Sequence, residues 1–172
     1  MTITQAHPAV DCRTLSVRYG RIQALNQVSF TVTPGQVYAL LGRNGSGKTS
    51  LVRCLLGHQK PLAGRVDLLG QDVWSSRTEL MQRVGVVAEE PDAPATMTPR
   101  QLLSFCAGLY PTWDSAAADD RLKRFRVPLD VPFGKLSRGQ KAQLSMTLAP
   151  GPEARAAGAG RPHPRPGPSG PP

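Results

Sequence analysis

The sequence predicts a mixed α/β fold, with short strands in the first part of the chain and helices in the second. Residues 12–42 alternate short apolar stretches with turn residues, a pattern typical of strands. Residues 98–125 instead carry apolar residues at helical spacing, after a threonine and a proline that suit a helix start. Strands followed by helices predict a β-rich part joined to a helical insert.

Three strands are expected in the first part, at residues 15–17, 28–32 and 37–41. The third leads directly into a glycine-rich turn. Residues 49–56 follow with helical periodicity and end at Gly57, which suits a helix C-cap. The order strand, glycine-rich loop, helix is the one that a phosphate-binding site requires.

The middle of the chain predicts a further strand and turn at residues 64–70. It also predicts a buried strand at residues 84–88, followed by a loop rich in proline and acids. Two helices are then expected, from residue 98 or 99 to 109 and from residue 114 or 115 to 124.

The chain has 172 residues, which suits one domain with its own core. Its longest apolar runs fall well short of the roughly 20 residues that a membrane-spanning helix needs. The first residues have neither the basic start nor the apolar stretch of a signal peptide. We therefore expect a cytoplasmic protein whose role at a membrane comes through a partner.

The distribution of charge and of cysteines argues against a nucleic-acid-binding protein and against a fold held by metal or disulfides. The formal net charge is +9, but Lys and Arg are scattered, and the local group at residues 121–126 lacks the interleaved aromatic pattern of single-strand binders. We expect no nucleic-acid partner. Cys12, Cys54 and Cys106 lie far apart in the sequence, which predicts reduced, packed thiols rather than a metal site or disulfide frame.

Residues 42–49 match the phosphate-binding motif G-x-x-x-x-G-K-[ST]. Glycines let successive backbone N–H groups turn inward around phosphate oxygens, and the following helix adds its positive N-terminal pole. Lys48 is expected to reach the β and γ phosphates, and the Thr49 hydroxyl to ligate Mg²⁺. The residues predicted to bind the nucleotide here are Gly42, Arg43, Asn44, Gly45, Ser46, Gly47, Lys48, Thr49 and Ser50.

This loop alone does not distinguish kinases, GTPases, helicases and transporters, but a second motif does. Leu136-Ser137-Arg138-Gly139-Gln140, followed by a helical run over residues 141–149, resembles the L-S-G-G-Q signature of ABC transporter ATPases, with arginine at the third place. The resemblance implies that Ser137 and Gly139 face the γ-phosphate of an ATP held by the opposite subunit. The alternative is a serine that only caps a helix.

Two single residues add weaker support. Tyr19 stands where this family usually has an aromatic residue that stacks on adenine; the alternative is a packing residue. Glu89 follows the predicted strand at residues 84–88, where the family more often has glutamine. A carboxylate there can hold Mg²⁺ or a water, and the alternative is an exposed loop acid.

The resemblance covers residues 10–149 and implies a P-loop NTPase fold of the ABC type, with an antiparallel β front, a parallel core sheet and a helical subdomain, incomplete at its C-terminus. It divides a partial ATPase domain, residues 1–149, into a β-rich P-loop core (1–97) and a helical subdomain (98–149). Residues 150–172 hold eight prolines and five glycines and no Val, Ile, Leu or aromatic residue, so we expect them to be disordered.

The family continues after the signature with a Walker B strand, a catalytic acid, a D-loop and a switch histidine, and none follows here; His163 has no strand before it. The codons of residues 156–168, read one base later with free choice of degenerate bases, can spell L-L-V-L-D-D-P-T-L-G-L-D. This is a Walker B strand with its acid and D-loop at the family's spacing. We therefore hypothesise a one-base frameshift between about residues 148 and 155.

These motifs predict an ATP-binding subunit of an ABC transporter, with Mg²⁺, a second identical or different ATPase subunit, and transmembrane permease subunits, at the inner face of the cell membrane. As written, we expect weak or absent hydrolysis and poor solubility. One alternative is a soluble ABC-type ATPase acting on DNA or the ribosome, which usually has two copies in one chain or a long insert. A second is a small P-loop kinase, which leaves residues 136–140 unexplained. A third is a non-catalytic product that only binds nucleotide or has no function.

Overall fold

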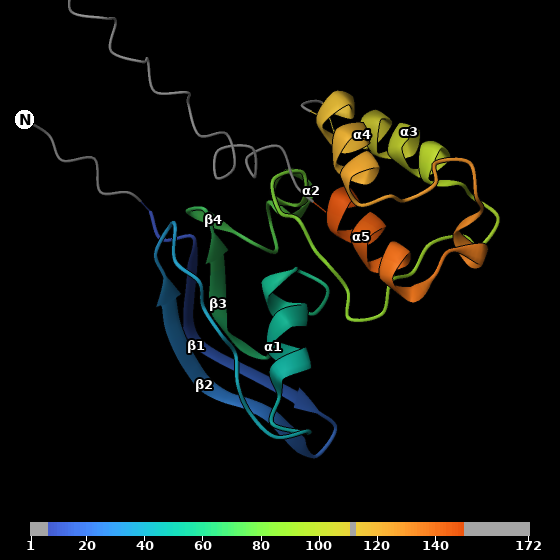
Figure 1. Ribbon diagram of the computed structural model, residues 1–172. Coiled ribbons are helices and arrows are strands. Elements are labelled where there is room, and N and C mark those ends of the chain that lie inside the picture. Colours follow the sequence, from blue (N-terminus) through green and yellow to red (C-terminus); the bar gives the residue numbers. More distant parts are fainter. Residues whose placement is uncertain (1–6, 111–112, 150–172) are drawn as a thin grey trace, which may run out of the picture. The chain divides into compact units, whose positions relative to one another are not determined.

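The computed structural model describes residues 7–110 and 113–149, and the chain forms two compact units that divide between Gln82 and Arg83 (Figure 1). In the described residues, the first unit holds an antiparallel sheet and two helices. The second unit holds three α-helices and one 3-10 helix. The family-based boundary after residue 97 stays a prediction.

The sheet of the first unit has four strands in the order β2-β1-β3-β4. β1 (Val10–Tyr19) pairs on one side with β2 (Ile22–Val32) and on the other with β3 (Ala63–Leu68), to which the short β4 (Gln71–Asp72) is added. All these pairings are antiparallel. The predicted strands at residues 15–17, 28–32 and 64–70 are confirmed, since each overlaps one of the three longer strands.

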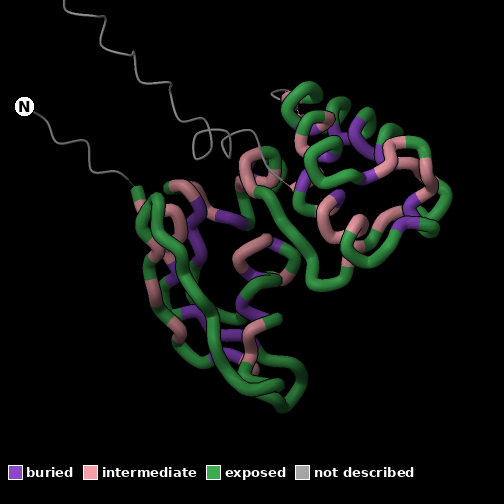
Figure 2. The backbone as a smooth tube through the Cα atoms, in the orientation of Figure 1, coloured by how far each residue is buried: buried purple, intermediate pink, exposed green. Residues whose placement is uncertain are grey.

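Helix α1 (Lys48–Leu55) lies along one face of the sheet (Figure 1), as the helical periodicity of residues 49–56 predicts. Gly57 follows the helix in the left-handed region with φ of +63°, which confirms its place at the C-terminal end. Figure 2 shows that most of the buried residues of this unit lie on the strands and on α1; Val73 and Leu80, which are also buried, lie after β4 and on the short helix at residues 77–81. The buried residues on the strands and α1 include Cys12, Leu15, Val17, Leu51, Cys54, Val66 and Leu68.

The three cysteines are all buried and free, as expected. Burial raises the pKa of the Cys12 thiol to about 11 and also raises the pKa values of Cys54 and Cys106. Because the thiolate is the reactive form, we expect native protein at pH 8 to resist alkylation by iodoacetamide and urea-unfolded protein to react at all three sites. Mass spectrometry checks this, and rapid labelling of native Cys12 would contradict it.

The second unit is built from α3 (Pro99–Leu109), α4 (Ser115–Arg124), the 3-10 helix η1 (Phe133–Lys135) and α5 (Arg138–Leu148). The two helices expected between residues 98 and 124 are confirmed. Thr98 caps α3 and Asp114 caps α4 through side-chain oxygens that accept backbone N–H groups. The core of this unit consists of Leu102, Leu103, Ala118, Leu122, Val127, Phe133, Leu136 and Leu144.

The predicted strands at residues 37–41 and 84–88 are wrong. Neither segment is a strand, and the side chains of Val37 and Leu41 are 99% and 87% exposed. A strand exists only where a neighbour satisfies its backbone N–H and C=O groups. Among the described residues no strand pairs with either segment, so the parallel core sheet implied by the resemblance is not seen there.

The sequence patterns also miss two short elements of the first unit, β4 and α2 (Arg77–Met81). Residues 150–172, for which disorder is predicted, lie outside the described residues. Across residues 7–110 and 113–149, no helix combines the length and the apolar character that crossing a bilayer requires.

Candidate phosphate-binding site

The glycine-rich loop at residues 42–47 leads directly into α1, whose N-cap is Gly47. Gly45 and Gly47 both have left-handed backbones, with φ of +81° and +90°, which glycine adopts without strain. Among the described residues, no side chain caps the start of this helix. The N–H groups of its first turn, which have no partner within the helix, therefore remain available to an anion.

Close packing against the sheet fixes this loop. A Cβ atom at Gly47 would lie 2.4 Å from the backbone oxygen of Ala24 and 2.7 Å from a methyl carbon of Leu25, both on β2. A Cβ at Gly42 would lie 2.6 Å from Oγ of Ser46. The loop thus depends on glycine both for its turns and for its contact with β2, which holds the start of α1 beside the sheet.

Replacing Gly47 with alanine is expected to destabilise the fold by about 2 kcal/mol, because the new methyl group meets backbone and the φ value is strained. Gly139→Ala is the matched control, since a Cβ there meets nothing within 4 Å. Urea unfolding of the two variants measures the difference. Equal midpoints for both variants would contradict the packing described here.

Lys48 lies over its own loop. Its ammonium donates hydrogen bonds to the carbonyl oxygens of Gly42 at 2.6 Å and Arg43 at 2.9 Å, and the N–H of Ser46 donates to the same Arg43 oxygen at 3.2 Å. The ammonium therefore stands at the loop, where a phosphate cradled by the backbone would meet a positive charge.

The other predicted residues of this loop differ in exposure. Arg43, Asn44 and Thr49 are exposed, so the Thr49 hydroxyl is open to solvent and to a metal ion. Ser50 is buried on α1. Its hydroxyl is the least accessible of the predicted nucleotide contacts.

The signature residues begin α5 in the second unit. Ser137 is the N-cap: its Oγ accepts the N–H of Gln140 at 3.2 Å, and Oε1 of Gln140 accepts the N–H of Ser137 at 3.0 Å. This reciprocal pair shows that Ser137 caps the helix, and its role toward ATP stays a prediction. The hydroxyl hydrogen of Ser137 stays available as a donor, because the cap uses only the oxygen. Leu136 is buried in the core of the unit and anchors the motif.

Arg138 and Gly139 are exposed in the first turn of α5. Arg138 has no left-handed backbone, so arginine replaces the family's glycine without strain. Nothing within 4 Å would meet a Cβ at Gly139. Since glycine costs roughly 0.5–1 kcal/mol relative to alanine inside a helix, the fold itself gives no reason for glycine here.

Tyr19 belongs to the first unit and Glu89 to the second. Tyr19 is the last residue of β1 and is 40% exposed; its hydroxyl donates a hydrogen bond to Oε1 of Gln59 at 2.6 Å. Sequence patterns did not point to Gln59. Glu89 is exposed in the second unit, whereas Thr49 belongs to the first, so their shared role toward Mg²⁺ stays a prediction. No cluster of three potential metal ligands occurs among the described residues.

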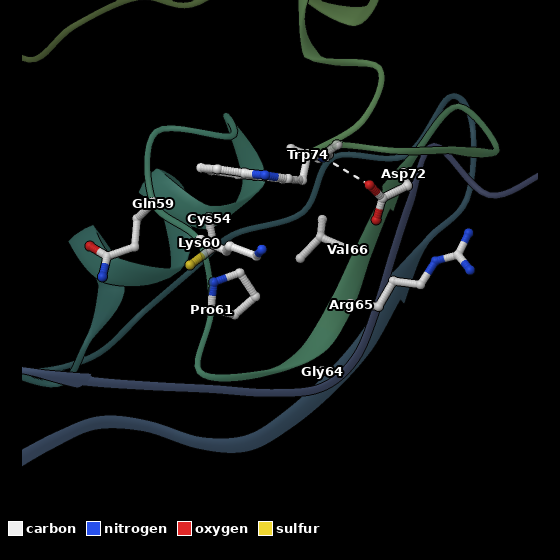
Figure 3. A pocket seen from close by; sticks show the side chains of 10 residues that line it. Cys54, Gln59, Lys60, Pro61, Gly64, Arg65, Val66, Asp72 and Trp74 are labelled. Atoms are coloured by element: carbon white, nitrogen blue, oxygen red, sulfur yellow. Dashed lines mark hydrogen bonds between the residues drawn. The ribbon is translucent and has the colours of Figure 1, made fainter.

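A separate cavity of about 200 Å³ lies beside the C-terminal part of α1 and β3 (Figure 3). Cys54 and Val66 line it, with Lys60 and the half-exposed Trp74. The Asp72 carboxylate accepts hydrogen bonds from the backbone N–H groups of Ser75 and Trp74. These bonds lower the pKa of Asp72, and the bond from Ser75 has the largest effect. The cavity does not include the glycine-rich loop.

Comparisons with known proteins agree with these motifs. The family model described as ABC transporter matches residues 25–150. The chain is 36% identical over 147 residues to the Nod factor export ATP-binding protein I of Burkholderia lata, covering 81% of this chain and 48% of that protein. It is 31% identical over 137 residues to the bacitracin transport ATP-binding protein BcrA of Bacillus licheniformis, covering 78% and 45%.

Among solved structures, this chain is similar to cbiO1 of Clostridium perfringens, part of the ABC transporter complex cbiONQ. The TM-score is 0.67 and the sequence identity 25%, over 82% of this chain and 60% of that chain. The chain spans about half the length of the two curated relatives it matches. The match of the family model over most of the chain, together with the glycine-rich loop and the capped signature turn, establishes that this protein belongs to the ABC transporter family of ATP-binding proteins.

Proposed function

We propose that the chain binds ATP with Mg²⁺ and serves as the ATP-binding subunit of an ABC transporter. One observation carries the proposal: α1 begins without a side-chain cap at Gly47, which is pressed against β2, and the Lys48 ammonium lies on the loop that precedes it. Such a loop offers backbone N–H groups and a cation to a polyphosphate. Thr49, which is exposed, would ligate Mg²⁺, with Glu89 as a further oxygen ligand.

The signature turn would contact an ATP bound to a second ATPase subunit. Ser137 keeps a hydroxyl donor beyond its capping bond, and Gly139 leaves space at the start of α5 that the chain's own fold does not use. Arg138 would bring an additional positive charge to that phosphate.

Partners and location follow from the same proposal. Two relatives are named for bacitracin transport and Nod factor export, and both are ATP-binding proteins. We propose that this protein likewise works with transmembrane permease subunits and with a second ATPase subunit, at the inner face of the cell membrane. The permease would determine what is carried.

A polypeptide of residues 1–172 is proposed to bind ATP without turning it over at a transporter's rate. Hydrolysis needs a carboxylate that holds Mg²⁺ and an acid that orients the attacking water. Residues 150–172 contain no run of apolar residues that ends in two acids.

Isothermal titration of residues 1–172 with MgATP tests the proposal. We expect saturable binding, and equal affinity in the Gly139→Glu variant, because the signature would serve the nucleotide of another subunit. Absence of binding by the unaltered chain would overturn the proposal. A large loss of affinity in Gly139→Glu would overturn the assignment of the signature to the partner's nucleotide.

A further inference from the structure

We infer that Gln59 is a positioning residue for Tyr19, holding the tyrosine ring in one orientation for the base of the nucleotide. The inference rests on the proposed function, because it assumes that Tyr19 meets the base. It adds a residue to the site that lies 40 positions away from Tyr19 in the sequence.

The ring stands at the tip of a hairpin. Tyr19 pairs with Ile22 across a two-residue turn that contains Gly20, whose φ is +57°. Tyr19 is 40% exposed, so packing alone does not fix its ring. The hydroxyl bond to Gln59, at 2.6 Å, is the contact that restrains the far end of the side chain.

Gln59 is itself held by the end of α1. The carbonyl oxygen of Arg53 accepts the N–H groups of both His58, at 2.8 Å, and Gln59, at 3.2 Å, just after the left-handed Gly57. The amide that receives the tyrosine hydroxyl therefore extends from a closed turn, not from a loose loop. Through this bond the hairpin is tied to the helix whose other end carries the glycine-rich loop.

Gln59 also lines the neighbouring cavity, but its amide is directed away from the other lining side chains. Figure 3 shows it pointing away from the cavity's interior, where Val66 and Trp74 lie. Two cations, Lys60 and Arg65, line that cavity, and the Lys60 ammonium stands 5.8 Å from the centre of the Trp74 ring. Gln59 and Lys60 are adjacent in sequence but serve different contacts, so Lys60 provides a matched control.

A tyrosine ring that is held in place before binding loses less conformational entropy when a base stacks on it. This smaller loss raises the affinity for the nucleotide about three- to tenfold. We therefore expect Tyr19→Phe and Gln59→Leu each to weaken MgATP binding about three- to tenfold. The double variant should lose no more MgATP affinity than the single variant that binds MgATP more weakly, because both changes remove the same hydrogen bond. Binding of magnesium tripolyphosphate, which has no base, should be unchanged in all three.

Lys60→Met should bind both ligands as the unaltered chain does. Full ATP affinity in Tyr19→Phe, additive losses in the double variant, or an equal loss for tripolyphosphate would each overturn the role of Gln59. If the unaltered chain binds neither ATP nor tripolyphosphate, the proposed function itself fails, which the titration of the unaltered chain distinguishes from a failure of this inference.

Discussion

Replacing Lys48 with alanine is expected to weaken MgATP binding by at least about a hundredfold, since a charge-assisted bond to phosphate is worth about 1.5–3 kcal/mol and this ammonium would contact two phosphates. In the structure the ammonium already lies on the loop, bonded to the carbonyl oxygens of Gly42 and Arg43. Isothermal titration with MgATP measures the loss.

Two controls separate charge at the loop from other effects. Lys60→Met removes a cation of the same unit that contacts Trp74 and not the loop, and it should leave the affinity unchanged. Thermal unfolding of Lys48→Ala shows whether the loop bonds also stabilise the fold. Unaltered MgATP affinity in a folded Lys48→Ala variant would remove the loop from the binding site.

Restoring the alternative reading frame is expected to raise ATP hydrolysis by at least about a hundredfold over residues 1–172, because a positioned acid or base typically contributes 10²–10⁴. Inserting or deleting one base between the codons of about residues 148 and 155 would shift the reading frame. The tail would then be replaced by a sequence that contains L-L-V-L-D-D-P-T-L-G-L-D. Its apolar part has the composition of a buried parallel strand, and its two aspartates would supply the metal-holding and water-orienting carboxylates.

Phosphate release measured on the two purified chains compares them directly. Changing the second aspartate of the restored string to asparagine should return hydrolysis to the level of residues 1–172 while MgATP binding persists. The frameshift hypothesis is refuted if the gene, sequenced again, contains no position where a single-base change yields that string. Equal hydrolysis by both chains would instead refute the role assigned to the string.

Local signals predicted the helices well. Thr98, Asp114 and Ser137 each cap a helix in the structure, because a capping side chain bonds to backbone only two or three residues away. The helix after the glycine-rich loop and its terminal Gly57 were predictable for the same reason. The strands predicted at residues 15–17 and 28–32 lie within β1 and β2, but the sequence patterns showed neither the full length of these strands nor the two-residue turn between them.

Predictions failed where structure depends on distant partners. The apolar runs at residues 37–41 and 84–88 have strand composition, but composition does not supply the neighbouring strand that would bond their backbones. The hydrogen bond between Tyr19 and Gln59 joins residues 40 positions apart, and the sequence around either residue gives no sign of it. The roles of Tyr19, Glu89 and the signature toward a nucleotide stay predictions, because each depends on a ligand or a second subunit.

The central claim is that backbone amides around the start of α1 hold the phosphates of ATP. Amide ¹H–¹⁵N spectra of the labelled chain, titrated with MgATP, test it most directly. We predict that the largest shifts fall on Gly45, Gly47, Lys48 and Thr49, with smaller ones at Tyr19 and none at Gly139. Saturating MgATP that leaves the amides of residues 42–50 unmoved would contradict the claim.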